Sequence, residues 1–107
     1  MIELEERELL EVIWRKGEAL AVYLHTPLCG TCRAARRMID VAEHLLPPGT
    51  FVSGNVNVLP NVVRQYRVAS VPALMVFEPD RKTPPVIHYA MRSVDSVLEY
   101  VREGARL

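Results

Sequence analysis

Hydrophobic positions along the chain alternate between two patterns, one typical of buried strands and one typical of amphipathic helices. The run Ala19-Leu20-Ala21-Val22-Tyr23-Leu24 is almost continuously apolar, as in a strand that is covered on both faces of a sheet. Residues 29–46 instead carry apolar side chains at helical spacing. The same patterns predict helices over 3–16, 29–46, 61–66 and 94–103, and strands over 19–24, 50–58, 73–77 and 86–90.

The order of these elements predicts an α/β fold. The succession α-β-α-β-α-β-β-α indicates a central mixed four-stranded sheet flanked by helices, with the last two strands antiparallel. Ser93 is a suitable N-cap for the last helix. In the first two helices the spacing predicts the buried faces: Leu9, Leu10, Ile13 and Trp14 in the first, and Ala34, Met38, Val41, Ala42 and Leu45 in the second.

Length and charge narrow the class of protein. The 107 residues correspond to one domain, 1–107, and the 13 basic residues balance the 13 acidic ones. This balance argues against a nucleic-acid binder, and no apolar run approaches the roughly 20 residues of a membrane helix. Acidic residues fill the N-terminus, where a secretory signal would be basic and then apolar. We therefore expect a cytoplasmic protein, in a reducing compartment.

The chain has two cysteines, Cys29 and Cys32, placed between a predicted strand and a predicted helix. Helical spacing puts their α-carbons about 5 to 6 Å apart, within reach of a disulfide. A structural disulfide that closes so small a ring adds only about 2 kcal/mol to the free energy of unfolding in the chain-entropy model. A redox role fits better, because the helix start lowers the pKa of Cys29 from about 8.5 toward neutrality. We expect Cys29 to be the nucleophile and the more shielded Cys32 the resolving thiol.

The sequence resembles the thioredoxin family in two segments, Tyr23-Leu24-His25-Thr26-Pro27-Leu28-Cys29-Gly30-Thr31-Cys32 and Tyr66-Arg67-Val68-Ala69-Ser70-Val71-Pro72. The resemblance spans nearly the whole chain. It implies a thioredoxin-like fold, a cis Val71–Pro72 bond beside the cysteines, and a groove completed by Ala90-Met91. The substrate-binding residues it implies are Leu28, Gly30, Thr31, Val71, Pro72 and Met91. It implies no organic cofactor and no metal.

This sequence departs from the family pattern in several places. The first strand of the family is expected to be absent, and Leu28 replaces the tryptophan that usually precedes the first cysteine. Tyr23 and Asn55 stand where the family has a buried acid and its lysine partner, so the usual route for deprotonating Cys32 is missing. Thr31 replaces a proline and frees a backbone N–H that could bond to Cys29.

Together these features favour a monomeric thiol–disulfide oxidoreductase that serves cell redox homeostasis. Its expected partners are a disulfide-bearing protein or small-thiol substrate and an electron donor, either a thiol reductase or a low-molecular-weight thiol, with no nucleic acid and no membrane. The alternative is a redox-sensing or metal- or iron–sulfur-binding module without turnover, although His25, His44 and His88 lack paired ligand spacing.

The basic residues Arg33, Arg36 and Arg37 follow the cysteine motif on the predicted helix. The favoured interpretation is a solvated helix face paired with Asp40 and Glu43. The second interpretation is a site for an anionic partner.

Overall fold

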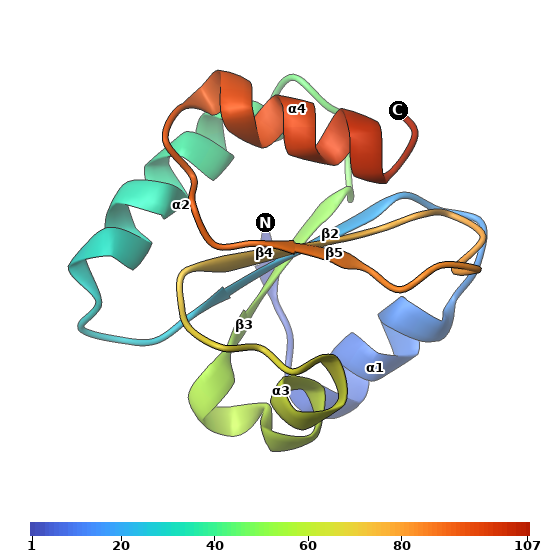
Figure 1. Cartoon of the computed structure of the whole chain (residues 1–107), viewed down its shortest axis with the longest axis horizontal. Coiled ribbons are helices and arrows are strands. Elements are labelled where there is room, and N and C mark those ends of the chain that lie inside the picture. The colour runs from blue at the N-terminus through green and yellow to red at the C-terminus, as the bar shows by residue number, and fades with distance from the viewer.

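A computed structural model describes residues 1–107 and shows a five-stranded mixed sheet with helices on both faces (Figure 1). In chain order the elements are β1 (Ile2–Glu3), α1 (Glu6–Trp14), β2 (Leu20–His25), α2 (Gly30–Glu43), β3 (Phe51–Asn55), the 3-10 turn η1 (Val56–Val58), α3 (Pro60–Tyr66), β4 (Ala73–Phe77), β5 (Val86–His88) and α4 (Val94–Gly104). The strand order is β1-β3-β2-β4-β5. The α/β class and the mixed sheet are confirmed.

The expected count of four strands is wrong, because a first strand precedes the N-terminal helix. β1 lies parallel to β3 with Ile2 opposite Val52 and Glu3 opposite Ser53, and the Leu4 N–H donates to the Ser53 carbonyl at 2.9 Å. Two residues at an exposed sheet edge carry no hydrophobic alternation. The sequence pattern therefore had no signal from which this strand could be predicted.

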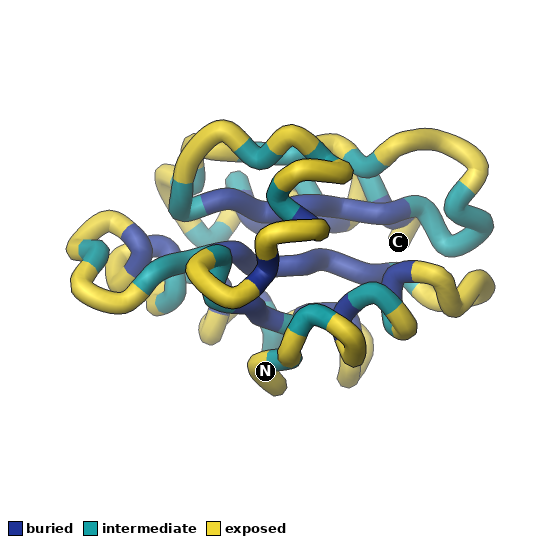
Figure 2. The backbone as a smooth tube through the Cα atoms, turned by 90° about the horizontal axis from the view of Figure 1, so that it is seen from below, coloured by how far each residue is buried: buried dark blue, intermediate teal, exposed yellow.

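The central strand β2 explains why its sequence is almost entirely apolar. It pairs in parallel with β3 and antiparallel with β4, and every residue from Leu20 to Leu24 is buried. Ala21 and Tyr23 point into the core under α2 and α4, whereas Val22 and Leu24 point into the core under α1 and α3. The buried layer runs through the middle of the molecule in Figure 2. Consecutive side chains of this strand therefore hold both layers of helices to one sheet.

Two of the predicted helix faces need correction. The buried residues of α2 are Cys32, Ala35, Ile39 and Ala42. Ala34 and Val41 are exposed instead, because they fall on the neighbouring row of the same helix, and Leu45 is exposed beyond the end of α2. Trp14, expected near the core, is 63% exposed, since α1 ends there and Ile13 takes the buried position.

The ends of several elements also differ from expectation. β3 ends at Asn55, where the Asn55 side chain accepts from the Asn57 N–H at 3.0 Å and begins η1. α1 and α2 are shorter than their predicted ranges, and β5 ends at His88 rather than at residue 90. Ser93 does cap α4, accepting from the Ser96 N–H at 3.0 Å. None of these helices combines the length and apolar character needed to cross a membrane.

Candidate functional site

The cysteine pair lies where β2 passes into α2. Cys29 is the N-cap of α2, and it is joined by a disulfide to Cys32 in the first turn, with the α-carbons 5.2 Å apart as predicted. The preceding residue, Leu28, has a positive φ of 61° and is 97% exposed. This turn redirects the chain from the sheet into the helix, and it leaves Cys29 half-buried at the surface while Cys32 is 4% exposed.

The Cys29 sulfur has two polar neighbours in the first turn of α2. Its Sγ accepts from the Cys32 N–H at 3.2 Å, and the Thr31 hydroxyl lies 3.5 Å away. In this disulfide form the contact from Thr31 comes from its side chain, and a hydrogen bond from its backbone N–H to a Cys29 thiolate stays a prediction. A free N–H at a helix N-cap bonds well to a negatively charged acceptor, so this geometry favours an ionised sulfur once the disulfide is opened.

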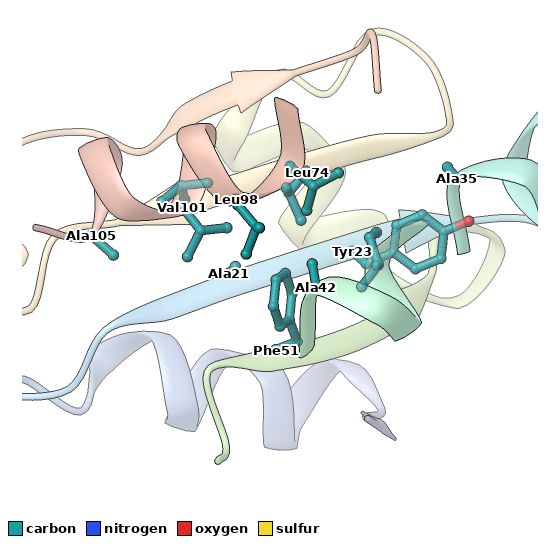
Figure 3. Packing of buried hydrophobic residues seen from close by; sticks show 12 residues of the cluster. Ala21, Tyr23, Ala35, Ala42, Phe51, Leu74, Leu98, Val101 and Ala105 are labelled. Carbon is teal, nitrogen blue, oxygen red and sulfur yellow. The ribbon is translucent and has the colours of Figure 1, made fainter. Parts of the chain in front are cut away.

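Tyr23 occupies the buried position beneath the pair. Its hydroxyl donates to the Cys32 carbonyl at 2.5 Å, and Figure 3 shows it directed toward the helix that carries Ala35. Burial raises the pKa of Tyr23 to about 12, with the nearby Arg36 opposing the shift. Asn55, at the other departure from the family pattern, caps η1 instead of pairing with a charge. The phenol is therefore a hydrogen-bond donor that stays protonated near neutral pH.

Residues from three separate segments meet beside the pair. The Val71–Pro72 bond is cis, as the resemblance implies, and a pocket of about 360 Å³ brings together Thr31, Pro72 and Met91. Tyr89 and Arg92 also line this pocket, and the Tyr89 hydroxyl accepts from the Ala69 N–H at 3.0 Å. The sequence analysis missed Tyr89 and Arg92, although both lie within two residues of Met91.

The other predicted substrate-binding residues are distributed differently. Val71 lines a smaller pocket of about 180 Å³ together with Val63 and Val68 of the α3 region. Gly30 has no atom within 4 Å of where a Cβ would lie, so its position on the first turn is open. Leu28 does not line the pocket of Met91. It lies in another pocket, of about 450 Å³, that both cysteines border.

The histidines do not combine with the cysteines. His25 is hydrogen-bonded to Glu3 and stacks on the Tyr23 ring, with centroids 5.4 Å apart. His88 stacks on Tyr100 with centroids 3.7 Å apart. No three histidine, cysteine, aspartate or glutamate side chains lie close enough to one another to hold a metal ion within this chain.

Comparison with known proteins finds close and distant similarity along the whole chain. The sequence is 33% identical over 103 residues to the thioredoxin-like protein YusE of Bacillus subtilis, and this match covers 96% of this chain and 92% of that protein. It is 24% identical over 106 residues to a protein disulfide-isomerase of Schizosaccharomyces pombe, and that match covers 96% of this chain but 30% of the larger protein. No family model matches the chain.

Solved structures share the fold. Chloroplastic thioredoxin z aligns with a TM-score of 0.81 at 17% identity, over 96% of this chain and 92% of that one. A thioredoxin from Halobacterium salinarum aligns with a TM-score of 0.80 at 14% identity, over 99% and 91%. Mitochondrial thioredoxin 3 from Saccharomyces cerevisiae aligns with a TM-score of 0.77 at 13% identity, over 96% and 94%.

Proposed function

Because the chain belongs to the thioredoxin family, we propose that it is a thiol–disulfide oxidoreductase whose reacting groups are the sulfurs of Cys29 and Cys32. The observation that carries this proposal is the position of the pair. Cys29 is a helix N-cap whose sulfur accepts an N–H hydrogen bond, and the shielded Cys32 follows one turn later. The first cysteine is accessible to a substrate and the second is within bonding distance of the first.

The reducing reaction proceeds in two exchange steps. The Cys29 thiolate attacks one sulfur of a substrate disulfide, which forms a mixed disulfide and releases the other substrate sulfur as a thiolate. Cys32 then loses its proton to solvent and attacks the Cys29 sulfur. The second substrate sulfur leaves, the substrate has gained two electrons, and the protein holds the Cys29–Cys32 disulfide.

The N-cap position of Cys29 matters most when the electron donor reduces the protein again. Stabilising a thiolate makes that sulfur a better leaving group but a weaker nucleophile, with a Brønsted slope of about 0.4–0.5. When the donor reduces the protein again, its thiol attacks the accessible Cys29 sulfur and releases Cys32. A second donor thiol then attacks the donor sulfur of this mixed disulfide, and the Cys29 thiolate is the leaving group. The donor is a thiol reductase or a low-molecular-weight thiol, and we place this cycle in cytoplasmic redox homeostasis, with the protein acting as a monomer.

The pocket that contains Thr31, Pro72 and Met91 is the proposed docking place for a protein substrate. Val71 lies beside it and precedes the cis bond, so its backbone N–H and C=O are candidates for pairing with an extended substrate segment. Leu28, almost fully exposed, offers an apolar contact next to Cys29. These residues recognise a substrate by shape and backbone geometry.

Serine substitutions test the assignment of the two cysteines. Cys29→Ser should abolish the reduction of insulin disulfides, because no thiolate remains at the accessible position. Cys32→Ser should accumulate mixed disulfides with substrate, which intact-protein mass spectrometry detects. Leu45→Ala, an exposed position beyond the C-terminal end of α2, is a control that should retain activity.

Full turnover by Cys29→Ser would overturn the proposal, provided that circular dichroism shows both variants folded. Thiol titration and metal analysis of anaerobically purified protein address the competing class. Two free thiols that oxidise reversibly support exchange, and about one tightly held metal ion per chain or per pair of chains would instead support a binding module.

A further inference from the structure

A second pocket borders the cysteine pair, and three arginines lie in its wall. It has a volume of about 450 Å³ and lies between the end of β2 and the first turns of α2. Its lining residues are Tyr23, His25, Thr26, Pro27, Leu28, Cys29, Cys32, Arg33, Arg36 and Arg37. Both sulfur-bearing residues therefore face a hollow that is separate from the pocket of Pro72 and Met91.

The positive charge of this wall is largely uncompensated. Arg33 and Arg37 form no ion pair, and Arg36 meets Asp40 only at 3.7 Å in a solvent-exposed (i, i+4) contact. Glu43, the other expected partner, binds the N-terminal ammonium group at 3.1 Å. The expectation that this helix face is neutralised by its own acids is therefore wrong for two of the three arginines.

The three arginines share one face of α2 because they are spaced by three and four residues. His25 also lines the pocket and is hydrogen-bonded to Glu3, and no aspartate or glutamate is among the lining residues. In a chain with no net charge, this is a local concentration of guanidinium groups next to a reactive sulfur. Guanidinium groups bind carboxylates through paired N–H donors, so the pocket suits an anion.

We propose that this pocket binds an anionic low-molecular-weight disulfide, one that bears carboxylates, and places one of its sulfurs against Cys29. This inference rests on the proposed function and names a substrate class for the same cysteine pair. The volume lies within the range of about 300–1,000 Å³ that is usual for small-molecule sites. The other pocket carries a single arginine, Arg92, among Thr31, Pro72 and Met91, and it has no comparable charge.

The reaction in this pocket is a balanced exchange. The Cys29 thiolate attacks one sulfur of the small disulfide, the S–S bond of that molecule breaks, and one small thiolate leaves. Cys32 loses a proton to solvent and attacks the Cys29 sulfur, which releases the second small thiolate. The protein gives two electrons and ends as the Cys29–Cys32 disulfide, so a single turnover of reduced protein needs no further reductant.

The experiment compares three small disulfides that differ in charge: oxidised glutathione, which is anionic, hydroxyethyl disulfide, which is neutral, and cystamine, which is cationic. Pre-reduced protein is mixed with each, quenched with acid and an alkylating reagent, and followed by mass spectrometry. Removing the charges of Arg33 and Arg37 also changes the electrostatic potential at Cys29, and thus its reactivity toward every disulfide. The rate with hydroxyethyl disulfide therefore serves as the reference for each variant.

At low salt, the Arg33→Gln/Arg37→Gln double variant should lower the rate with oxidised glutathione, relative to the neutral reference, by about tenfold or more. The relative rate with cystamine should rise. Added salt should reduce the preference of the unmodified protein for the anionic disulfide. The matched control is Arg7→Gln/Arg15→Gln, which removes the same charge from α1 and the residue that follows it. It should leave both relative rates, with oxidised glutathione and with cystamine, within twofold of those of the unmodified protein.

An unchanged relative rate with oxidised glutathione in the Arg33/Arg37 variant would overturn the pocket assignment. An equal loss in the Arg7/Arg15 control would also overturn it, because the effect would then come from overall charge. In both cases the proposed function stands as long as the neutral disulfide reacts. If none of the three disulfides oxidises the reduced protein, the proposed function itself fails.

Discussion

Tyr23 is the residue at which this chain differs most in chemistry from its family pattern. A carboxylate at this depth could take a proton from Cys32, whereas the phenol donates its own proton to the Cys32 carbonyl at 2.5 Å. With a pKa of about 12, raised by burial, the phenol cannot act as a base near neutral pH. Its hydrogen bond holds the first turn of α2 against β2, and the phenol is unsuited to serve as a base for Cys32.

Tyr23→Phe separates these two roles. The free energy of unfolding should fall by about 1 kcal/mol, the usual net contribution of one hydrogen bond, while the pH dependence of activity between pH 6 and 9 stays the same. Urea unfolding and the pH profile of disulfide reduction measure the two effects. A shifted profile in the variant would show that the phenol does take part in proton transfer.

The same group predicts how stability responds to alkaline pH. The folded protein keeps the Tyr23 proton up to about pH 12, whereas an unfolded chain releases it near the ordinary value of 10.0. The unfolded state therefore binds fewer protons between these values, and stability falls as pH rises from 10 toward 12. The fall should be less steep in Tyr23→Phe. Tyrosinate absorbance should show a component titrating near pH 12 that the variant lacks.

At the scale of elements, Gly104 shows how helix α4 approaches the sheet. A Cβ at Gly104 would lie 2.7 Å from Val76 Cγ1 and 3.1 Å from Val76 Cβ. Val76 is 1% exposed in β4, and its branched side chain cannot rotate its own Cβ away. The glycine thus allows α4 to lie close to β4, although the sequence alone suggests only that it ends the helix.

Gly104→Ala should therefore be destabilising. Helix propensity alone predicts a gain of up to about 1 kcal/mol, and less at the last residue of a helix. Overpacking against a buried strand typically costs about 1–3 kcal/mol, so the net expected loss is about 1 kcal/mol. The midpoint of urea unfolding measures it. In a Val76→Ala background the same change should become neutral or stabilising, and a loss of equal size there would refute the contact.

Gly54 and the helix α2 show what the sequence could and could not predict at this scale. Gly54 weakens the strand pattern of β3, but a Cβ there would lie 2.5 Å from Cδ1 of the fully buried Leu59, which would have to shift. Tertiary contacts of this kind leave no pattern in the neighbouring sequence from which they could be predicted. Other features depend only on nearby residues, and the structure confirms their positions. They are the cysteine motif at the start of α2, the N-cap Ser93, and the apolar segments that form β2 and β4.

The candidate site likewise has parts that the sequence predicts and parts that it does not. Spacing along the chain sufficed to pair Cys29 with Cys32, because both lie in one helical turn. The meeting of Thr31, Pro72 and Met91 followed only from resemblance, since they come from three separate segments. A site for an anionic partner at Arg33, Arg36 and Arg37 was only the second interpretation of the sequence, because nothing local shows that the N-terminal ammonium group takes Glu43 as its partner.

At the scale of the whole molecule, two cores lie on opposite faces of one sheet. Figure 1 shows α2 and α4 on one side and α1 and α3 on the other. Val97 is fully buried in the first core and Val62 in the second. The shared strands β2 and β4 contribute side chains to both cores. If either helix layer unfolded, it would expose apolar side chains of strands that also form the core on the opposite face. We therefore expect the chain to unfold as one cooperative unit.

Val62→Ala and Val97→Ala test this coupling with the same chemical change on each face. Each should lower the free energy of unfolding by about 2 kcal/mol, from two lost methyl groups and a small cavity. Because the two side chains lie on opposite faces of the sheet, the double variant should lose the sum to within about 0.5 kcal/mol. Far-UV circular dichroism and the fluorescence of Trp14 should report the same urea midpoint and m-value in every variant. If Val62→Ala moved the Trp14 transition ahead of the circular dichroism transition, the layer formed by α1 and α3 would be unfolding separately, and the sheet would not couple the two cores.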